Sequence, residues 1–385
     1  MKKIVLLGST GTIGRNTLDI VRRNPRLFRV TGLAAGSNRA LLESQIREFR
    51  PVLVSVDRAE DAAALRRALG RRSLEILSGP EGAEAVAAES AAEIAVSAIT
   101  GFNGLGPTLA AVRAGKVVAL ANKESMVAAG PLLRREAKRS GASFIPVDSE
   151  HSGVFQCLAG QKHSDVRRVV LTASGGPFLR TPLGELRRKK PAEALAHPRW
   201  TMGRKVTIDS ATMMNKGLEL IEARWLFDLE PSRLGVLIHP QSVVHALVEL
   251  RDGSVLAQLS RPDMRVPIQY ALTFPERRDG LPPALDLAAV GSLEFFIPDE
   301  RRFPALKTAR WVLGEKDSAA VALNASNEIA VEAFLEGRLP FPGISRLVDE
   351  VLAEVRPRTM ESLEDIWAED CRIRERTRRI LAKRT

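Results

Sequence analysis

The sequence predicts an α/β fold in its N-terminal part, an α+β middle part and a helical C-terminal part. Three observations support this prediction. Short apolar runs alternate with amphipathic segments through about the first 150 residues, a pattern typical of a parallel sheet with helices on its faces. This alternation stops near His151. From about residue 305 onward, apolar residues recur at helical spacing.

The N-terminal part contains apolar runs that we expect to be strands. They span residues 4–7, 30–34, 52–56, 94–98, 117–120 and 144–147. Amphipathic segments lie between these runs, and we expect helices to begin near Ile13, Arg39, Asp61, Gly104 and Lys123. Repeated strand–helix units predict a Rossmann-like domain over residues 1–150.

The remainder of the chain follows a different pattern. We expect a strand at 169–173, a helix at 213–227, a hairpin of 243–250 and 254–259 around Asp252-Gly253, and helices at 319–335, 343–355 and 360–383. Residues 276–304 are rich in Pro, Arg and Asp and are expected to be a connector. The prediction is therefore a second domain at 151–275, the connector at 276–304 and a helical domain at 305–385.

Length and composition narrow the class of protein. A chain of 385 residues exceeds the usual size of one hydrophobic core, so we expect two or three domains. No apolar run approaches the ~20 residues that span a bilayer, and the N-terminus lacks the pattern of a signal peptide. The cysteines, Cys157 and Cys371, lie far apart in sequence. We expect a cytoplasmic protein with reduced thiols, without membrane or disulfide anchoring.

The net charge of +11 raises nucleic-acid binding as an alternative function. The arginines are spread along the chain, however, and the one dense basic stretch is residues 372–384. Basic patches that bind phosphate backbones are clustered. We therefore interpret the stretch as a solvated helix face, expect no nucleic-acid partner, and expect the surplus charge to attract small anionic substrates.

A glycine-rich loop, Gly8 to Gly14, follows the first predicted strand and precedes the first predicted helix. In this position a glycine turn lets backbone N–H groups and the helix N-terminus approach a pyrophosphate. The spacing is G-x-x-G-x-x-G rather than G-x-G-x-x-G, so the position is better evidence than the motif. A plain strand-to-helix turn is the alternative.

The end of the second predicted strand indicates which dinucleotide binds. NAD-binding domains usually carry an acid there, whereas this chain has Ala35-Gly36-Ser37-Asn38-Arg39. No acid in this segment would repel a 2′-phosphate, and Arg39 could bind one. The segment favours NADP over NAD, with an exposed helix-start arginine as the alternative interpretation.

Two acids follow the last apolar run of the N-terminal part. Asp148 and Glu150 lie at i and i+2, and on an extended backbone both would point to one face. Hard oxygen donors at the carboxyl end of a strand suit Mg²⁺ or Mn²⁺ better than zinc. A helix N-cap acid beside a solvated glutamate is the alternative.

A second polar set lies around the helix predicted at 213–227. Leu218, Ile221 and Trp225 form an apolar stripe, and Lys216 and Glu219 share another edge. Hydroxyl groups that we expect just before this helix, together with an amide and a lysine, suit a phosphate monoester. The hydroxyls are those of Thr207, Ser210 and Thr212, and a further set is Thr172-Ala173-Ser174-Gly175-Gly176. Capping and turn formation are the alternatives for either set alone.

The polar segment from His197 to Gly203 contains one large aromatic residue, Trp200. An exposed tryptophan in a mobile loop is costly unless it closes on a ligand, so a substrate lid is one interpretation. A tryptophan packed at a domain junction is the other.

Taken together, the motifs resemble the 1-deoxy-D-xylulose 5-phosphate reductoisomerase family of the non-mevalonate isoprenoid pathway. The matching segments are GSTGTIG (8–14), LANKES (120–125), PVDSEH (146–151), TASGGPF (172–178), HPRWTMG (197–203), IDSATMMNKGLELIEA (208–223) and IHPQSVVHALVE (238–249). The resemblance implies an NADPH domain, a catalytic and dimerising domain, a helical bundle and a homodimer.

The resemblance also implies site residues. The metal ligands would be Asp148, Glu150 and Glu219, for Mn²⁺, Mg²⁺ or Co²⁺. Substrate contacts would come from Lys123, Ser149, Glu150, Ser174, His197, Trp200, Ser210, Asn215, Lys216 and Glu219, with Lys123, Asp148, Glu150 and Glu219 catalytic. Cofactor contacts would come from Thr10, Gly11, Thr12, Ile13, Gly36, Ser37, Asn38, Asn122, Glu124 and Gly203. Ser37 stands where a basic residue is common in the family, so Arg39 would carry more of the 2′-phosphate binding. Arg199 is a second departure from the family pattern.

The implied reaction rearranges 1-deoxy-D-xylulose 5-phosphate to an aldehyde and reduces it with NADPH to 2-C-methyl-D-erythritol 4-phosphate. The metal would hold the ketone and hydroxyl oxygens, and the phosphate would anchor the substrate. A simple NADP-linked dehydrogenase is the rival enzyme. In the semialdehyde type it would need a nucleophilic cysteine, whereas Cys157 lies in an apolar stretch that we interpret as core.

Overall fold

The computed structural model describes residues 1–385 except 71–73, 201, 281 and 385. The chain forms two compact units, and neither is continuous in sequence. The first unit comprises Met1–Ser125, Leu133–Ser152 and Asp263–Pro283, and the second comprises Met126–Leu132, Gly153–Pro262 and Ala284–Thr385.

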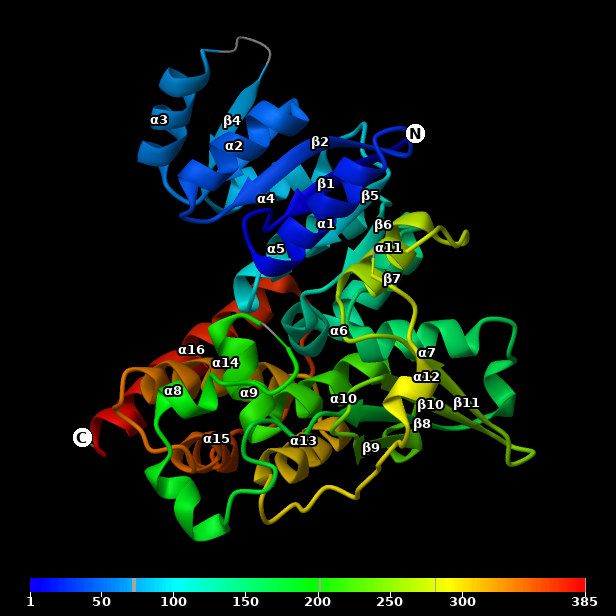
Figure 1. Ribbon diagram of the computed structural model, residues 1–385. Coiled ribbons are helices and arrows are strands. Elements are labelled where there is room, and N and C mark those ends of the chain that lie inside the picture. The colour runs from blue at the N-terminus through cyan, green and yellow to red at the C-terminus, as the bar shows by residue number, and fades with distance from the viewer. Residues whose placement is uncertain (71–73, 201, 281, 385) are drawn as a thin grey trace. The chain divides into compact units, whose positions relative to one another are not determined.

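The first unit is built on a parallel sheet, which confirms the predicted α/β class. In the described residues its strands are β1 (Lys2–Leu7), β2 (Phe28–Ala35), β3 (Leu53–Val56), β4 (Glu75–Ser78), β5 (Ile94–Ser97), β6 (Val117–Leu120) and β7 (Ser143–Pro146). They lie in the order β4-β3-β2-β1-β5-β6-β7 (Figure 1), and every neighbouring pair is parallel. The strand order reverses beside β1, the position where α/β sheets bind ligands.

Helices connect these strands. They are α1 (Thr12–Arg23), α2 (Arg39–Phe49), α3 (Ala59–Leu69), α4 (Gly79–Ala88), α5 (Leu105–Arg113) and α6 (Lys123–Ser140). Helix α7 (Ser149–Leu158) follows β7 and continues into the second unit. Residues Ile4 to Leu7 of β1 are fully buried, because the central strand is covered on both faces. The sequence did not predict β4 and α4, since this edge strand has only two large apolar residues, Ile76 and Leu77.

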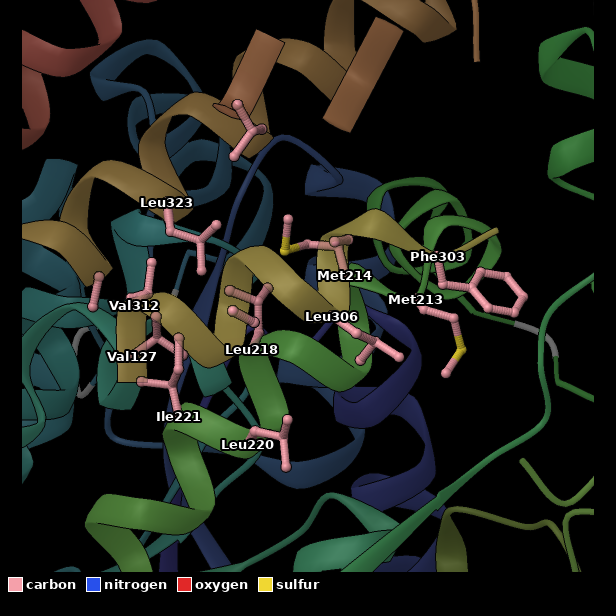
Figure 2. Packing of buried hydrophobic residues seen from close by; sticks show 14 of the residues in the cluster. Val127, Met213, Met214, Leu218, Leu220, Ile221, Phe303, Leu306, Val312 and Leu323 are labelled. Atoms are coloured by element: carbon pink, nitrogen blue, oxygen red, sulfur yellow. The ribbon is translucent and has the colours of Figure 1, made fainter. Parts of the chain in front are cut away.

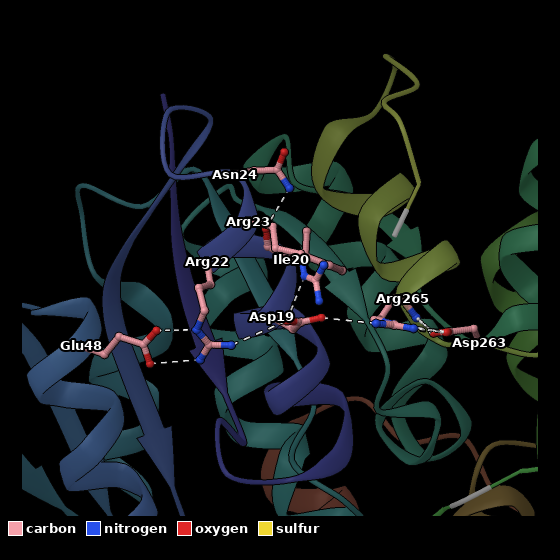
Figure 3. Close-up of polar contacts among 8 residues, drawn as sticks. All are labelled: Asp19, Ile20, Arg22, Arg23, Asn24, Glu48, Asp263 and Arg265. Carbon is pink, nitrogen blue, oxygen red and sulfur yellow. Dashed lines mark hydrogen bonds and ion pairs between the residues drawn. The ribbon is translucent and has the colours of Figure 1, made fainter. Parts of the chain in front are cut away.

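A late segment of the chain completes the first unit. Helix α11 (Arg265–Thr273) carries Arg265, whose guanidinium contacts Asp19 of α1 at 3.4 Å and Asp263 at 2.6 Å (Figure 3). The ammonium group of Lys2 donates to the carbonyls of Leu272 and Phe274 at 3.1 and 3.0 Å. These contacts join residues about 250 positions apart in the sequence.

The second unit contains a smaller mixed sheet. Its strands in the described chain are β8 (Val166–Ala173), β9 (Leu234–Ile238), β10 (Val244–Leu250) and β11 (Val255–Leu259), in the order β11-β10-β8-β9. The β10–β11 hairpin confirms the predicted Asp-Gly turn: Gly253 has φ +89°, and Ser254 N donates to Asp252 Oδ1 at 2.9 Å.

Helices pack against this sheet and against each other. They are α8 (Pro191–Ala194), α9 (Arg204–Thr212), α10 (Met214–Phe227), α12 (Leu287–Val290), α13 (Pro304–Gly314), α14 (Ser318–Leu335), α15 (Gly343–Ala353) and α16 (Leu363–Ala382). Apart from the exposed α12, these helices contribute apolar side chains to one buried cluster, in which Leu218 and Ile221 of α10 meet Leu306 and Val312 of α13 (Figure 2). Helices α14, α15 and α16 confirm the predicted helical C-terminal part.

The basic C-terminal stretch is helix α16. Its arginines form ion pairs with acidic residues: Arg372 with Glu369, Arg374 with Asp370 and Glu328, Arg376 with Glu354, and Arg379 with Glu375. The stretch is therefore a paired helix face. No helix in the described part of the chain is long and apolar enough to cross a bilayer.

Candidate active site

The glycine-rich loop joins β1 to α1. Gly8 has φ +86°, and a Cβ there would lie 2.5 Å from the carbonyl oxygen of Ala98. A Cβ on Gly14 would lie 2.3 Å from the carbonyl oxygen of Gly8, so both positions require glycine. Helix α1 begins without a side-chain cap and without an acid in its first turn. Its N-terminal N–H groups therefore suit an anionic ligand.

A buried hydroxyl lies in the same loop. Ser9 has no exposed surface, and its Oγ has no hydrogen-bond partner among the described residues. Burying a hydroxyl without a partner costs about 1–3 kcal/mol. A bound polar ligand at this loop would satisfy it.

The loop after β2 holds the residues predicted to select the cofactor. Asn38 caps α2 by accepting a hydrogen bond from Leu41 N at 3.2 Å. Arg39 Nη1 lies 3.5 Å from Asp61 Oδ1. An acid that the sequence analysis did not identify also lies near: a Cβ on Gly36 would be 3.1 Å from Asp57 Oδ2. An acid from the neighbouring strand end therefore borders this loop.

Asn122 and Glu124 are buried where β6 meets α6. The Asn122 side chain accepts from Ser125 N at 3.0 Å and donates to the carbonyls of Ile99 and Gly101 at 2.6 and 2.9 Å. It thus caps α6 and ties together the loops that follow β5 and β6.

Asp148 and Glu150 lie beyond β7, but not on extended backbone. Strand β7 ends at Pro146, and Ser152 N donates to the Asp148 carbonyl at 2.8 Å, which is a helical bond. The prediction that both side chains project from a strand is therefore wrong. Asp148 directly precedes α7 and Glu150 lies in its first turn, because Asp and Ser favour helix starts and the helix dipole favours an early acid.

The first unit contains a buried ion pair beside these acids. Lys123 Nζ, at the start of α6, lies 2.5 Å from Asp148 Oδ2, and Ser149 Oγ donates to Glu150 Oε2 at 2.6 Å. Because β6 and β7 are neighbours, their carboxyl ends bring together residues that are distant in sequence.

The second unit brings together the residues predicted to bind phosphate. Ser174 follows β8, and its Oγ lies 3.0 Å from His197 Nε2 and accepts from Gly176 N at 3.1 Å. A Cβ on Gly176 would lie 2.7 Å from the carbonyl oxygen of Ser210, so the Ser174 loop packs directly on α9. Ser174, Ser210 and His197 therefore lie on adjoining segments.

The hydroxyls of α9 differ from the prediction. Residues 204–212 form a helix of their own rather than a loop before one. Thr207 Oγ1 donates to the Gly203 carbonyl at 2.9 Å and Thr212 Oγ1 to that of Ile208 at 3.3 Å. Within the described residues, the Ser210 hydroxyl makes no such bond to the helix backbone, so it can donate to a ligand.

Helix α10 begins directly after Met213, which has φ +63° and ends α9. Lys216 forms an ion pair with Glu219, as the three-residue spacing predicts, and both side chains are about 97% buried. Asn215 Nδ2 donates to the other oxygen of Glu219 at 2.5 Å. The carboxylate is thus held by an ammonium and an amide, the expected behaviour of a buried charge.

His197 is neutral, and its tautomer follows from its contacts. The backbone N–H groups of Trp200 and Arg199 donate to Nδ1 at 2.9 and 3.2 Å, so Nδ1 carries no proton. Nε2 therefore carries the proton and donates to Ser174 Oγ. Burial lowers the pKa of His197 to about 4.

The segment that holds Trp200 lies against the second sheet. Arg199 Nε donates to the Pro240 carbonyl at 3.2 Å, and the half-buried Trp200 ring lies 6.3 Å from the His245 ring. Thr201, in the same predicted lid, lies outside the described residues.

The sequence analysis did not identify three buried polar residues that are close in sequence to predicted site residues. His151 and Glu222 are fully buried one position from Glu150 and one turn from Glu219, respectively. Asp209, beside Ser210, pairs with Lys205 at 2.9 Å and accepts from Asn327 Nδ2 at 2.8 Å. The i, i+3 spacing of Glu219 and Glu222 was the available signal for one of them.

Cys157 is half-buried against the core, and burial raises the pKa of its thiol. A poorly ionised thiol is a weak nucleophile. The rival of a semialdehyde-type dehydrogenase therefore loses its candidate cysteine.

Three sequence models match this chain. That of 1-deoxy-D-xylulose 5-phosphate reductoisomerase matches residues 4–130, and those of two C-terminal domains of the same enzyme match 144–227 and 259–376. The reductoisomerases of Geobacter metallireducens and Chlorobium phaeobacteroides are each 51% identical, over 99% and 97% of this chain and 99% and 98% of their own. The chain belongs to the 1-deoxy-D-xylulose 5-phosphate reductoisomerase family.

Solved structures of the reductoisomerase family share the fold. One, in complex with NADPH, fosmidomycin and magnesium, has a TM-score of 0.94 and 40% identity over 99% of this chain and 98% of its own. The Zymomonas mobilis reductoisomerase in complex with NADPH has a TM-score of 0.92 and 40% identity, over 99% of both chains. Family membership confirms the resemblance drawn from the motifs.

Proposed function

We propose that the protein converts 1-deoxy-D-xylulose 5-phosphate to 2-C-methyl-D-erythritol 4-phosphate, using NADPH and a divalent metal ion. Family membership over the whole chain is the observation that carries this proposal. Related enzymes solved with NADPH, magnesium and fosmidomycin support the choice of cofactor and metal. When bound, the metal supplies a Lewis acid for the sugar oxygens and NADPH supplies the hydride.

Asp148, Glu150 and Glu219 are the proposed metal ligands. Carboxylate oxygens are the donors that Mg²⁺ and Mn²⁺ prefer, and Co²⁺ accepts them too. The buried Lys123 neutralises Asp148 in the first unit, and the buried Lys216 neutralises Glu219 in the second. Carboxylates whose charge is balanced in this way within each unit support the proposal.

Ser174, Ser210, Asn215 and Lys216 are the proposed phosphate-binding groups. They offer hydroxyl, amide and ammonium donors on adjoining segments of the second unit. His197 holds Ser174 in place through its Nε2–H, and Trp200 covers the bound substrate. Lys123 and Ser149 contact the reacting oxygens, with Lys123 holding or donating a proton at a substrate hydroxyl.

The NADPH site is proposed at the carboxyl edge of the first sheet. The closely packed glycines and the unpartnered Ser9 hydroxyl fit a pyrophosphate. The proposed contacts are those of Thr10, Gly11, Thr12, Ile13, Gly36, Ser37, Asn38, Asn122, Glu124 and Gly203. The domain roles inferred for 1–150, 151–275, 276–304 and 305–385 and a cytoplasmic location remain part of the proposal.

A homodimer is the proposed assembly. Strand β11 is an edge of the second sheet, with Val255 54% exposed. The connector exposes Leu287, Phe295, Phe296 and Ile297, the last at 86%. Exposed apolar side chains and a sheet edge are typical of a protein–protein interface. Sedimentation equilibrium tests the proposal, and a monomer at micromolar concentration would contradict it.

The decisive experiment follows NADPH oxidation by absorbance after addition of 1-deoxy-D-xylulose 5-phosphate. We expect turnover with Mg²⁺ or Mn²⁺ and none with excess chelator. The product is identified by phosphorus and carbon NMR. Absence of turnover with every divalent ion would overturn the proposed function.

A further inference from the structure

Three charged side chains meet at the loops that follow β2 and β3 in the first unit. Arg39 is the first residue of α2, Arg58 directly precedes α3, and Asp61 lies in the first turn of α3. Arg39 Nη1 lies 3.5 Å from Asp61 Oδ1, and Arg58 Nε lies 3.8 Å from Asp61 Oδ2. One carboxylate therefore draws two guanidinium groups to one place.

Burial differs sharply within this group. The Asp61 side chain is 16% exposed, whereas those of Arg39 and Arg58 are 50% and 63% exposed. The carboxylate is thus fixed against the protein and the arginines reach solvent. Each guanidinium has five N–H donors, and the long contacts with Asp61 occupy few of them. Arg58 Nη1 also donates to Glu60 at 2.8 Å, which still leaves donors on both arginines.

The position of the pair matches the ribose end of a dinucleotide. In doubly wound sheets the 2′ position of the adenosine ribose lies near the end of the second strand. Here Asp57 borders that strand end, next to Gly36, and its charge would repel a 2′-phosphate. A 2′-phosphate at this strand end would therefore need guanidinium donors close to it, and Arg39 and Arg58 converge on Asp61 with most of their N–H donors still available.

We propose that Arg58 is a second 2′-phosphate-binding residue, acting with Arg39, and that Asp61 positions both guanidinium groups. The inference rests on NADPH being the cofactor, as proposed above. It assigns to the loop after β3 a part in cofactor selection, although the sequence placed selection in the loop after β2 alone. Bidentate guanidinium–phosphate geometry is the chemistry that the pair offers.

The test uses 2′,5′-ADP and 5′-ADP as probes, with calorimetric titration of the full chain without metal or sugar phosphate. We expect Arg58→Ala and Arg39→Ala each to weaken 2′,5′-ADP binding about tenfold and to leave 5′-ADP binding unchanged. The ratio of kcat/KM for NADPH to that for NADH should fall by a similar factor.

Arg47→Ala is the matched control. Arg47 lies on α2, is 58% exposed and pairs with Glu43 at 2.6 Å, so its loss removes the same charge from the same unit. Equal weakening by Arg47→Ala and Arg58→Ala would show a general field effect and overturn the proposal. So would 2′,5′-ADP binding by Arg58→Ala within twofold of the parent.

Two further measurements separate other causes of failure. Arg58 makes no side-chain cap to α3, so Arg58→Ala should keep its melting temperature, and Arg58→Lys should restore only part of the affinity because a lysine lacks the planar fork. Full restoration by lysine would overturn the bidentate contact. A chain that binds 2′,5′-ADP but does not turn over the sugar phosphate would contradict the proposed function and leave this inference standing.

Discussion

Each unit contains a lysine–carboxylate pair, and the two pairs are built differently. In the first unit, Lys123 and Asp148 are 25 positions apart and meet because β6 and β7 are neighbours in the sheet. In the second unit, Lys216 and Glu219 are three positions apart on one helix. The first pair therefore requires the pairing of β6 with β7, whereas the second requires one turn of α10.

The pairs also differ in their contact with water. The Lys216 and Glu219 side chains are 3% and 2% exposed, whereas those of Lys123 and Asp148 are 7% and 15% exposed. In both units an ammonium group neutralises a carboxylate that is proposed above as a metal ligand. The charges of the proposed ligands Asp148 and Glu219 are thus each balanced within their own unit, and the pair on the helix is the less exposed of the two.

The largest expected effect is on turnover. Glu150→Gln and Glu219→Gln should each lower kcat/KM by about 10³-fold or more, because each removes a proposed metal ligand and with it several kcal/mol of charge stabilisation. NADPH affinity of Glu150→Gln, measured by fluorescence titration, should stay within about twofold of the parent.

Glu185→Gln, at an exposed position of residues 183–188, is the control and should keep full activity. Retained turnover in either site variant would remove that glutamate from the proposed metal ligands. A loss of NADPH affinity that parallels the loss of turnover would show that the metal and cofactor sites are wrongly separated.

The next effect is on stability and is specific to the drier pair. Glu219→Leu should lower the free energy of unfolding by about 3–5 kcal/mol, because it removes the carboxylate that pairs with the buried ammonium group of Lys216. The double variant Lys216→Met/Glu219→Leu should recover most of this loss. Asp148→Leu should cost less, since water reaches that side chain. Urea unfolding of the four chains measures these differences, and equal costs for the two pairs would refute the distinction.

A smaller effect is a pH dependence of stability that arises from His197 in the second unit. The pKa of His197 is about 4 in the folded protein and about 6.5 in the unfolded chain, so between these values only the unfolded chain binds the proton. Stability should fall as pH decreases from 6.5 to 4, by up to about 3 kcal/mol. Over that range the free energy of unfolding of the parent should fall by this amount more than that of His197→Gln. Above pH 7 the two curves of stability against pH should be parallel. Curves that stay parallel over the lower range as well would contradict the assignment.

The smallest expected effect concerns Trp200. Burying its indole against bound substrate should contribute about 1–3 kcal/mol to binding. Trp200→Ala should therefore raise KM for the sugar phosphate and weaken a metal-chelating phosphonate inhibitor. The melting temperature should hardly change. A destabilised variant with normal KM would instead place Trp200 in a purely structural role.

The two lysine–carboxylate pairs also show which contacts can be predicted from the sequence and which cannot. Buried parallel strands are continuous apolar runs, so β1, β2 and β6 were predictable, and the i, i+3 spacing predicted the Lys216–Glu219 pair. The Lys123–Asp148 contact was not predictable as a distance, because it depends on strand order. The same holds for Arg58 and Arg39, which only the pairing of β2 with β3 brings near each other.

Helix α9 and the start of α7 show why two local structures could not be predicted from the sequence. Thr207, Asp209 and Ser210 have low helix propensity, and α9 is supported by the Asp209–Asn327 hydrogen bond, which joins positions 118 apart. Around Asp148, the two acids are compatible with either a strand end or a helix start. The i, i+2 spacing favoured a strand end, but the backbone bond from Ser152 N to the Asp148 carbonyl forms a helix start.

The return of residues 263–283 to the first unit has a consequence for synthesis on the ribosome. Residues 1–152 contain the whole parallel sheet, yet α11 and its Arg265–Asp19 contact are complete only after about 120 further residues, some 6–24 s later at ordinary elongation rates. Until then, the nascent sheet lacks its last covering helix, and its exposed apolar surface makes the growing chain prone to aggregation.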